Sequence, residues 1–222
     1  MTPILFDFNG TMFLDTAENE AAWQQIITTV AHHHITQAEF KNFLHGSLNE
    51  VIVRHFVGEA LSAELVEQYS LEKEKIYRQL CLQMPSGMHL TPGLIPVLEQ
   101  LKAHHVPMTI ASSAMPVNMD FYFDKLQLER WFKRDQVICN DGTLPGKPDP
   151  AFYLAAAAKL QVKPEECLVV EDALSGIQAA VAAQVKTIMA ISSTNTRDYL
   201  AQIPEVNCII NDFNEFANYY AL

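Results

Sequence analysis

The sequence lacks several features that would assign it to other classes of protein. Four cysteines among 222 residues are spaced too widely for a disulfide framework or a cysteine-rich metal site, so we expect free thiols in a reducing cytoplasm. No apolar run approaches the roughly 20 residues that cross a bilayer, and the apolar segment 3–6 is too short for a signal peptide. Basic residues number 15 against 26 acidic ones, for a net charge of −11. This balance disfavours nucleic acid or an anionic membrane as a partner.

What the chain does contain is a repeated strand-then-helix pattern. Nearly half of its residues (49%) are hydrophobic, and short apolar runs alternate with segments of helical periodicity. Such alternation indicates a doubly wound, Rossmann-like parallel sheet with helices on both faces. We expect strands at 4–8, 106–111, 137–139, 167–170, 186–190 and 208–210. We expect helices at 94–104, 116–126, 149–160 and 173–183, and a last surface helix at 212–220.

The alternation is interrupted between residues 15 and 83, where no strand-like run occurs. This helical segment is too long for an ordinary crossover, so we expect an inserted α-helical cap domain at 15–85 and an α/β core domain at 1–14 and 86–222. Trp23 is expected in the core of the cap, and the three histidines 32–34 at a polar helix end. Apolar residues mark the expected inner faces of the cap helices: Ala22, Ile26, Val30, Phe40, Phe43, Leu44, Leu65, Tyr69, Ile76 and Leu80.

Four polar motifs each follow a predicted strand or lie just before a predicted helix. They are Asp7-Phe8-Asn9-Gly10-Thr11, Ser112-Ser113, Gly146-Lys147-Pro148-Asp149-Pro150 and Glu171-Asp172. Ligands of open α/β sheets bind at the carboxyl ends of the strands, where such motifs gather. Hydroxyls and helix-terminal amides suit a phosphate, and adjacent carboxylates need a cation such as Mg²⁺. Taken singly, each motif also has a structural explanation as a helix cap, a turn or an exposed loop.

In this order the four motifs resemble those of the haloacid dehalogenase superfamily, and the helical insert after the first motif is similar to its β-phosphoglucomutase-like branch. The resemblance implies a Mg²⁺-dependent phosphatase in which Asp7 attacks phosphorus and water hydrolyses the aspartyl-phosphate. It assigns catalysis to Asp7, Asn9 and Lys147. It assigns the metal to Asp7, Asn9, Glu171 and Asp172. It assigns phosphate binding to Phe8, Asn9, Gly10, Thr11, Ser112, Ser113 and Lys147.

Position 9 departs from the family pattern, in which a second aspartate usually provides acid–base catalysis worth roughly 10²–10⁴-fold. Asn9 has no titratable proton. Three explanations stay open: a leaving group that needs little protonation, a substitute such as His45, or a slow or non-catalytic phosphometabolite-binding protein. The cap shows no arginine that we can align with the mutase pattern, which favours hydrolysis over a phosphosugar mutase. We expect a small phosphorylated metabolite, such as a sugar phosphate, contacted by His45 and Gly46.

Overall fold

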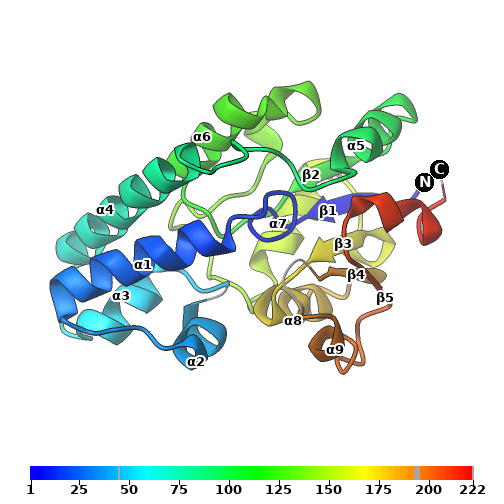
Figure 1. The fold of residues 1–222 in the computed structure, drawn as a ribbon. Coiled ribbons are helices and arrows are strands. Elements are labelled where there is room, and N and C mark those ends of the chain that lie inside the picture. Colours follow the sequence, from blue (N-terminus) through cyan, green and yellow to red (C-terminus); the bar gives the residue numbers. More distant parts are fainter. Residues whose placement is uncertain (45, 193–195, 222) are drawn as a thin grey trace. The chain divides into compact units, whose positions relative to one another are not determined.

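The structure is a computed structural model that describes residues 1–44, 46–192 and 196–221. The chain divides into two compact units (Figure 1). The α/β unit consists of Met1–Leu14 and His89–Leu222, and the helical unit of Asp15–Met88. Within the described ranges, no helix combines the length and the apolarity that a membrane span requires.

The α/β unit is built on a parallel sheet of five strands in the order β2-β1-β3-β4-β5. The strands are β1 (Ile4–Phe6), β2 (Met108–Ile110), β3 (Leu168–Glu171), β4 (Thr187–Ile191) and β5 (Cys208–Ile210). Because β1 pairs with β2 on one side and β3 on the other, the winding of the chain reverses there. Ligands bind at such a switch point. The predicted doubly wound α/β fold is confirmed.

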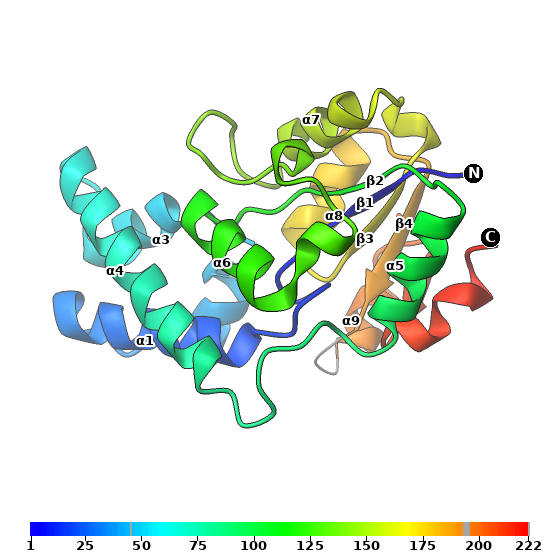
Figure 2. The same cartoon turned by 90° about the horizontal axis from the view of Figure 1, so that it is seen from above.

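Two layers of side chains cover the faces of the sheet. On one face Leu5 and Val169 pack with Phe152 from α7 (Ala151–Leu160) and with α8 (Leu174–Ala182). On the other, the Phe6 ring lies 6.3 Å from that of Phe132 and 6.2 Å from that of Phe213. Figure 2 shows α7 on the side opposite α5 (Leu94–Ala103). Burial on both faces explains why these strands are apolar on consecutive residues.

In the remaining elements, local sequence signals predicted some of the helix and strand bounds but not others. Helix α6 (Pro116–Leu126) has the predicted bounds, because proline favours the first helical position and Gln127 adopts a left-handed conformation with φ 54° at the end. The predicted strand at 137–139 is wrong: Ile138 forms only one isolated bridge, before the chain turns. The predicted last helix is a 3₁₀ segment (Phe213–Asn218) whose Phe213 and Phe216 are buried as expected. Helix α9 (Arg197–Leu200) is one turn long.

The helical unit contains α1 (Thr16–Ala31), α2 (Gln37–Glu39), a π-helical turn (Phe40–Leu44), α3 (Asn49–Val57) and α4 (Ala63–Leu82). Trp23 and Ile26 of α1 pack against Ile52 and Val53 of α3 in its apolar core. Trp23 is therefore a core residue, as predicted. Helix α1 ends before His32, which is left-handed with φ 51°, so the histidines do lie at a helix end.

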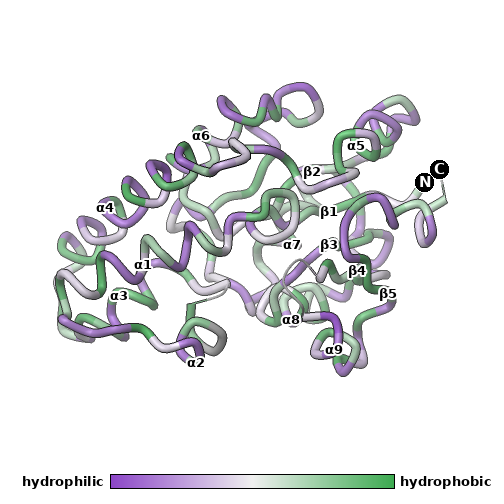
Figure 3. Tube along the Cα trace, viewed as in Figure 1, coloured by the Kyte–Doolittle hydropathy of each residue, from purple (hydrophilic) through white to green (hydrophobic). Residues whose placement is uncertain are grey.

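The inner face of α4 is only partly the predicted one, because Tyr69 and Ile76 pack against the apolar core as expected but other positions do not. Leu65 is 38% exposed, and Phe43 of the preceding segment is 40% exposed, although both were expected inside. The buried positions of α4 are instead Val66, Ser70, Lys73, Glu74, Tyr77 and Cys81. Polar residues on the inner side shift the apolar pattern away from the true face, and hydrophilic and hydrophobic stretches alternate along α4 in Figure 3.

Bonds within the helical unit compensate the buried charge of α4. The Lys73 ammonium donates to Asn19 Oδ1 at 2.6 Å and to Glu74 Oε1 at 3.1 Å. It also lies 4.9 Å from the centroid of the Trp23 ring and 5.0 Å from that of Tyr77. A buried ammonium is tolerated when it is paired and faces aromatic rings in this way.

Candidate active site

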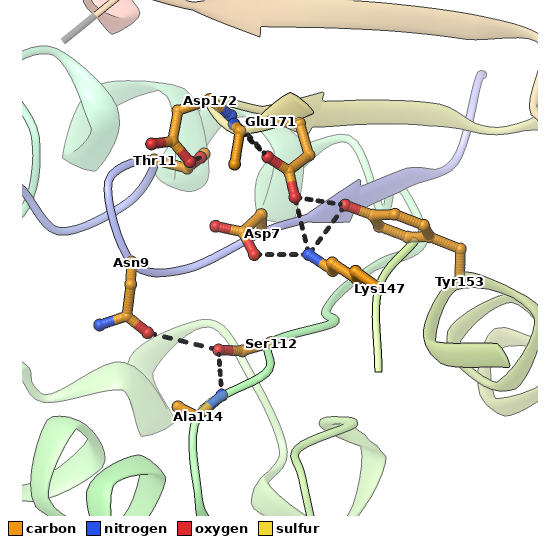
Figure 4. Close-up of polar contacts among 10 residues, drawn as sticks. Asp7, Asn9, Thr11, Ser112, Ala114, Lys147, Tyr153, Glu171 and Asp172 are labelled. Atoms are coloured by element: carbon orange, nitrogen blue, oxygen red, sulfur yellow. Dashed lines mark hydrogen bonds and ion pairs between the residues drawn. The ribbon is translucent and has the colours of Figure 1, made fainter. Parts of the chain in front are cut away.

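Residues from three of the predicted motifs converge where β1 and β3 end (Figure 4). Asp7 directly follows β1, and its N–H donates to the carbonyl of Val170 in β3 at 3.0 Å. Glu171 is the last residue of β3, and Asp172 follows it. Lys147 reaches the same place from the loop before α7. The topological switch point therefore carries three carboxylates and one ammonium.

Lys147 is the centre of this cluster. Its Nζ donates to Asp7 Oδ1 at 2.6 Å, to Glu171 Oε1 at 2.8 Å and to the Tyr153 hydroxyl at 3.1 Å. Burial acts to lower the pKa of Lys147, but the carboxylates of Asp7 and Glu171 outweigh it and hold that pKa well above its ordinary value. Lys147 is thus a permanently charged ammonium at neutral pH.

Glu171 is held by protein donors on both of its oxygens. Oε1 accepts from Lys147 at 2.8 Å and from the Tyr153 hydroxyl at 3.1 Å. Oε2 accepts from the backbone N–H groups of Asp172 and Ala173, both at 2.7 Å. A carboxylate has about four lone-pair positions, and these four bonds occupy them. The side chain, 1% exposed, is fixed in one orientation.

The charges of the cluster fit a divalent cation. One oxygen each from Asp7, Glu171 and Asp172 lies within 4.8 Å of the others. By formal charge, the three carboxylates and the Lys147 ammonium sum to −2 (−3 + 1). Hard oxygen donors of this kind suit Mg²⁺. Because four protein donors already surround Glu171, Asp7 and Asp172 fit direct coordination better.

Two glycines allow the backbone to approach these carboxylates. Gly10 has φ +78°, and a Cβ atom there would lie 2.1 Å from Asp172 Oδ2. A Cβ atom on Gly176, in the first turn of α8, would lie 1.5 Å from Glu171 Oε1. Any side chain at either position would displace a carboxylate, so the geometry of the cluster depends on both glycines.

Asn9 lies beside the cluster and is held at both ends of its amide. Its Nδ2 donates to the Tyr122 hydroxyl at 2.9 Å, and its Oδ1 accepts from Ser112 Oγ at 3.4 Å. Ser112 Oγ in turn accepts from the N–H of Ala114 at 3.1 Å. The Tyr122 ring is buried and stacked on Phe8, with 4.5 Å between ring centroids. The loop after β1 and helix α6 thus place position 9 rigidly.

The other predicted site residues lie as follows. Thr11 Oγ1 donates to Asp172 Oδ1 at 3.2 Å. The Phe8 side chain is fully buried, so any contact that it makes with a phosphate is through its backbone. Ser113 Oγ is buried and has no hydrogen-bond partner among the described residues. Gly46, with φ +79°, belongs to the helical unit, and His45 lies outside the described residues.

Two tyrosines belong to this site that the sequence did not single out. Tyr153 contacts Lys147 and Glu171, and Tyr122 contacts Asn9. Tyr153 and Tyr122 are each a buried aromatic residue on a helix, which is the pattern of ordinary core packing. The one available signal is that a buried tyrosine hydroxyl usually has a polar partner.

The fold and the site define an α/β protein with a buried lysine among carboxylates at its switch point and a helical unit inserted after β1. Residues 4–190 match the haloacid dehalogenase-like hydrolase family, and the chain belongs to that family.

Individual relatives agree with this assignment. A crystal structure of a HAD hydrolase, family IA, variant 3, from Entamoeba histolytica is 38% identical, with a TM-score of 0.87 over 97% of this chain and 95% of that one. Hexitol phosphatase A of Escherichia coli is 24% identical over 212 residues, which are 95% of this chain and 91% of that protein.

The fold is also similar to that of a β-phosphoglucomutase, the branch that the helical insert resembles. The crystal structure of β-phosphoglucomutase from Clostridium difficile has a TM-score of 0.79 and is 20% identical, over 97% of this chain and 92% of that one. This likeness is one of fold alone. The matches with several other curated relatives cover 50–65% of this chain and 34–51% of the length of those proteins.

Proposed function

We propose that the chain is a Mg²⁺-dependent phosphatase of a small phosphorylated metabolite, with sugar phosphates as the first class to test. The observation that carries this proposal is the Asp7 carboxylate at the switch point, 2.6 Å from a charged, buried Lys147. The net charge of −2 in the cluster supports a divalent cofactor. The name of the relative hexitol phosphatase A supports the substrate class.

Asp7 is the proposed nucleophile. An oxygen of Asp7 forms a bond to phosphorus while the bond between phosphorus and the leaving oxygen breaks. Water then attacks the phosphorus of the aspartyl-phosphate, releasing inorganic phosphate and restoring the carboxylate. Lys147 keeps Asp7 ionised, as an attacking carboxylate has to be, and its charge offsets that of the phosphoryl oxygens.

Asp7, the backbone carbonyl of Asn9 and Asp172 would hold the metal, with Glu171 beside them. When bound, Mg²⁺ supplies further stabilisation of negative charge on the phosphoryl group. Ser112 and the backbone amides of residues 8–11 are the proposed phosphate contacts, and Gly10 lets that backbone come close to an anion.

Asn9 limits the expected rate, because an amide cannot donate the proton that an alkoxide leaving group needs. A second candidate is therefore a catalytically weakened phosphometabolite-binding protein. The observation that favours it is the amide of Asn9, held between Tyr122 and Ser112 where an ionisable acid would otherwise stand. We assign the helical unit the role of a cap that selects the substrate, with the segment at His45 and Gly46 as its expected contact.

Phosphate release from p-nitrophenyl phosphate and a panel of sugar phosphates, with Mg²⁺ and with a chelator, tests the proposal. We expect Mg²⁺-dependent release that disappears in Asp7→Asn while the variant stays folded. Asp135→Asn, an exposed position of the same unit, is the matched control and keeps its activity. Metal-dependent binding of a sugar phosphate without release would favour the second candidate. Movement of phosphate between positions of one sugar, without release, would reveal a mutase.

A further inference from the structure

Tyr153 is a buried polar residue of the site that the proposed chemistry does not use. It lies on α7, is fully buried, accepts from Lys147 Nζ at 3.1 Å and donates to Glu171 Oε1 at 3.1 Å. We infer that Tyr153 is a positioning residue that fixes the Lys147 ammonium between the carboxylates of Asp7 and Glu171. The inference rests on the proposed function for its effect on catalysis, but its contacts are independent of that function.

The argument starts from the donors of Lys147. An ammonium group has three N–H bonds, and its three oxygen partners come from three different segments: Asp7 after β1, Glu171 at the end of β3, and Tyr153 on α7. With each N–H directed to its own partner, rotation about the Cε–Nζ bond is blocked. Tyr153 is the only neutral partner of the three, so it orients the ammonium without adding charge.

Packing alone does not account for the hydroxyl. The Tyr153 ring lies in the apolar cluster of Phe152, Ala156 and Ile177, where a phenylalanine ring would fill the same space. A hydroxyl buried there is unfavourable unless it is hydrogen-bonded. Lys147 Nζ lies 4.8 Å from the centroid of the Tyr153 ring, a contact that phenylalanine would keep. Tyr153→Phe therefore removes the hydroxyl and little else.

Loss of the hydroxyl leaves one N–H of Lys147 and one lone pair of Glu171 without their partner in a fully buried place. The ammonium is then free to turn, and its alignment with Asp7 is relaxed. Stabilisation of the transferring phosphoryl group depends on that alignment more than the binding of the ground state does. The expected effect is therefore on kcat rather than on KM.

Tyr153→Phe and Tyr220→Phe form a matched pair for the test. The Tyr220 hydroxyl donates to the carbonyl of Thr2 at 2.6 Å, in the same unit but outside the site. In the p-nitrophenyl phosphate assay at saturating Mg²⁺, Tyr153→Phe should lower kcat about tenfold and leave KM within about two-fold. Tyr220→Phe should keep both constants within about two-fold. An active protein whose kcat is unchanged in Tyr153→Phe would overturn the inference and leave the proposed function intact.

A double-mutant cycle with Lys147→Met tests the contact without any need for turnover. In buffer with Mg²⁺, Tyr153→Phe should change the unfolding equilibrium constant several-fold more when Lys147 is present than in Lys147→Met, where only the bond from the hydroxyl to Glu171 is lost. Equal changes in both backgrounds would overturn the inference. If the wild-type protein hydrolyses no phosphate ester, the phosphatase proposal has failed. The cycle still tests whether Tyr153 positions Lys147, because it needs no turnover. If Lys147→Met does not fold, the kinetic comparison with Tyr220→Phe decides alone.

Discussion

Substitution of Asn9 by aspartate isolates the acid–base component of the reaction. The two side chains have the same shape, and both contacts of Asn9 can persist in the variant. Ser112 Oγ donates to Asn9 Oδ1 at 3.4 Å and can donate to a carboxylate in the same way. The contact with Tyr122, now 2.9 Å from Asn9 Nδ2 to the hydroxyl, would reverse, so that the hydroxyl donates. The backbone carbonyl that is proposed to bind the metal is unaffected.

The expected gain follows from this retained geometry. General acid–base catalysis by a well-placed group is worth roughly 10²–10⁴-fold. The contacts with Tyr122 and Ser112 already hold position 9 in place, so little reorganisation opposes the gain. We expect Asn9→Asp to raise kcat at least about 100-fold for substrates with an alkoxide leaving group. For p-nitrophenyl phosphate, whose leaving group needs little protonation, the gain should be much smaller.

The assay is therefore a ratio of rates for sugar phosphates and p-nitrophenyl phosphate in the two proteins. Asn207→Asp is the matched control, because Asn207 Oδ1 accepts from the N–H of Ile188 at 2.7 Å, at the opposite end of the sheet. It adds the same negative charge and keeps its acceptor. Peptide mass spectrometry should accompany the wild-type assay, because asparagine before glycine, as in Asn9-Gly10, is prone to deamidation to aspartate.

Equal rates for the wild-type protein and the Asn9→Asp variant on the whole panel would refute the reasoning. That result would mean that another group already protonates the leaving oxygen. An equal gain for both kinds of leaving group would refute protonation of the leaving oxygen as the missing step, since it would point to the attack of water on the shared aspartyl-phosphate, to binding or to metal affinity.

Two further predictions concern backbone and pH. Gly10→Ala should abolish activity, because the new Cβ would lie 2.1 Å from Asp172 Oδ2. Gly142 is the control, since it has a similar φ of +84° and nothing within 4 Å of an added Cβ. Gly142→Ala should lower only the free energy of unfolding, by about 1–2 kcal/mol in urea denaturation. Equal losses of activity would contradict the steric argument. Burial raises the pKa of Cys81 to about 12, so the folded state keeps a proton that the unfolded thiol loses. The contribution of this thiol to the free energy of unfolding is therefore fully present below about pH 9. Above that pH, the free energy of unfolding should fall by up to about 1.4 kcal/mol per pH unit. The same titration with Cys81→Ala should lack this component, and a pH-independent difference between the two proteins would refute it.

The convergence of the main site residues could be predicted from the sequence for a simple reason. Parallel strands end at one edge, so polar residues that follow separate apolar runs meet there whatever the lengths of the connections. Asp7, Glu171 and Asp172 follow that rule directly. Lys147 satisfies it less directly, because the apolar run at 137–139 before it forms only an isolated bridge. Its position depends on the loop before α7 and on the two carboxylates that attract it.

Other features depend on tertiary contacts that leave no local pattern. The partners of Tyr153 lie 6 and 18 residues away in sequence, and Tyr122 lies 113 residues from Asn9. The inner face of α4 was predicted only in part for a related reason. Apolar periodicity assumes that buried positions are apolar, but Lys73 is buried through its bonds to Asn19 and Glu74.

The bond between Lys147 and Asp7 joins residues 140 positions apart, and this has a consequence for the order of folding. When β1 pairs with β3, the carboxylates of Asp7 and Glu171 are brought close together before the distant loop has to be in place. Repulsion between them opposes this pairing until the ammonium or a divalent cation arrives. Contacts so distant in sequence form slowly. We therefore expect repulsion between these charges to slow the formation of the central strand pair, and refolding of the protein to be faster in the presence of Mg²⁺.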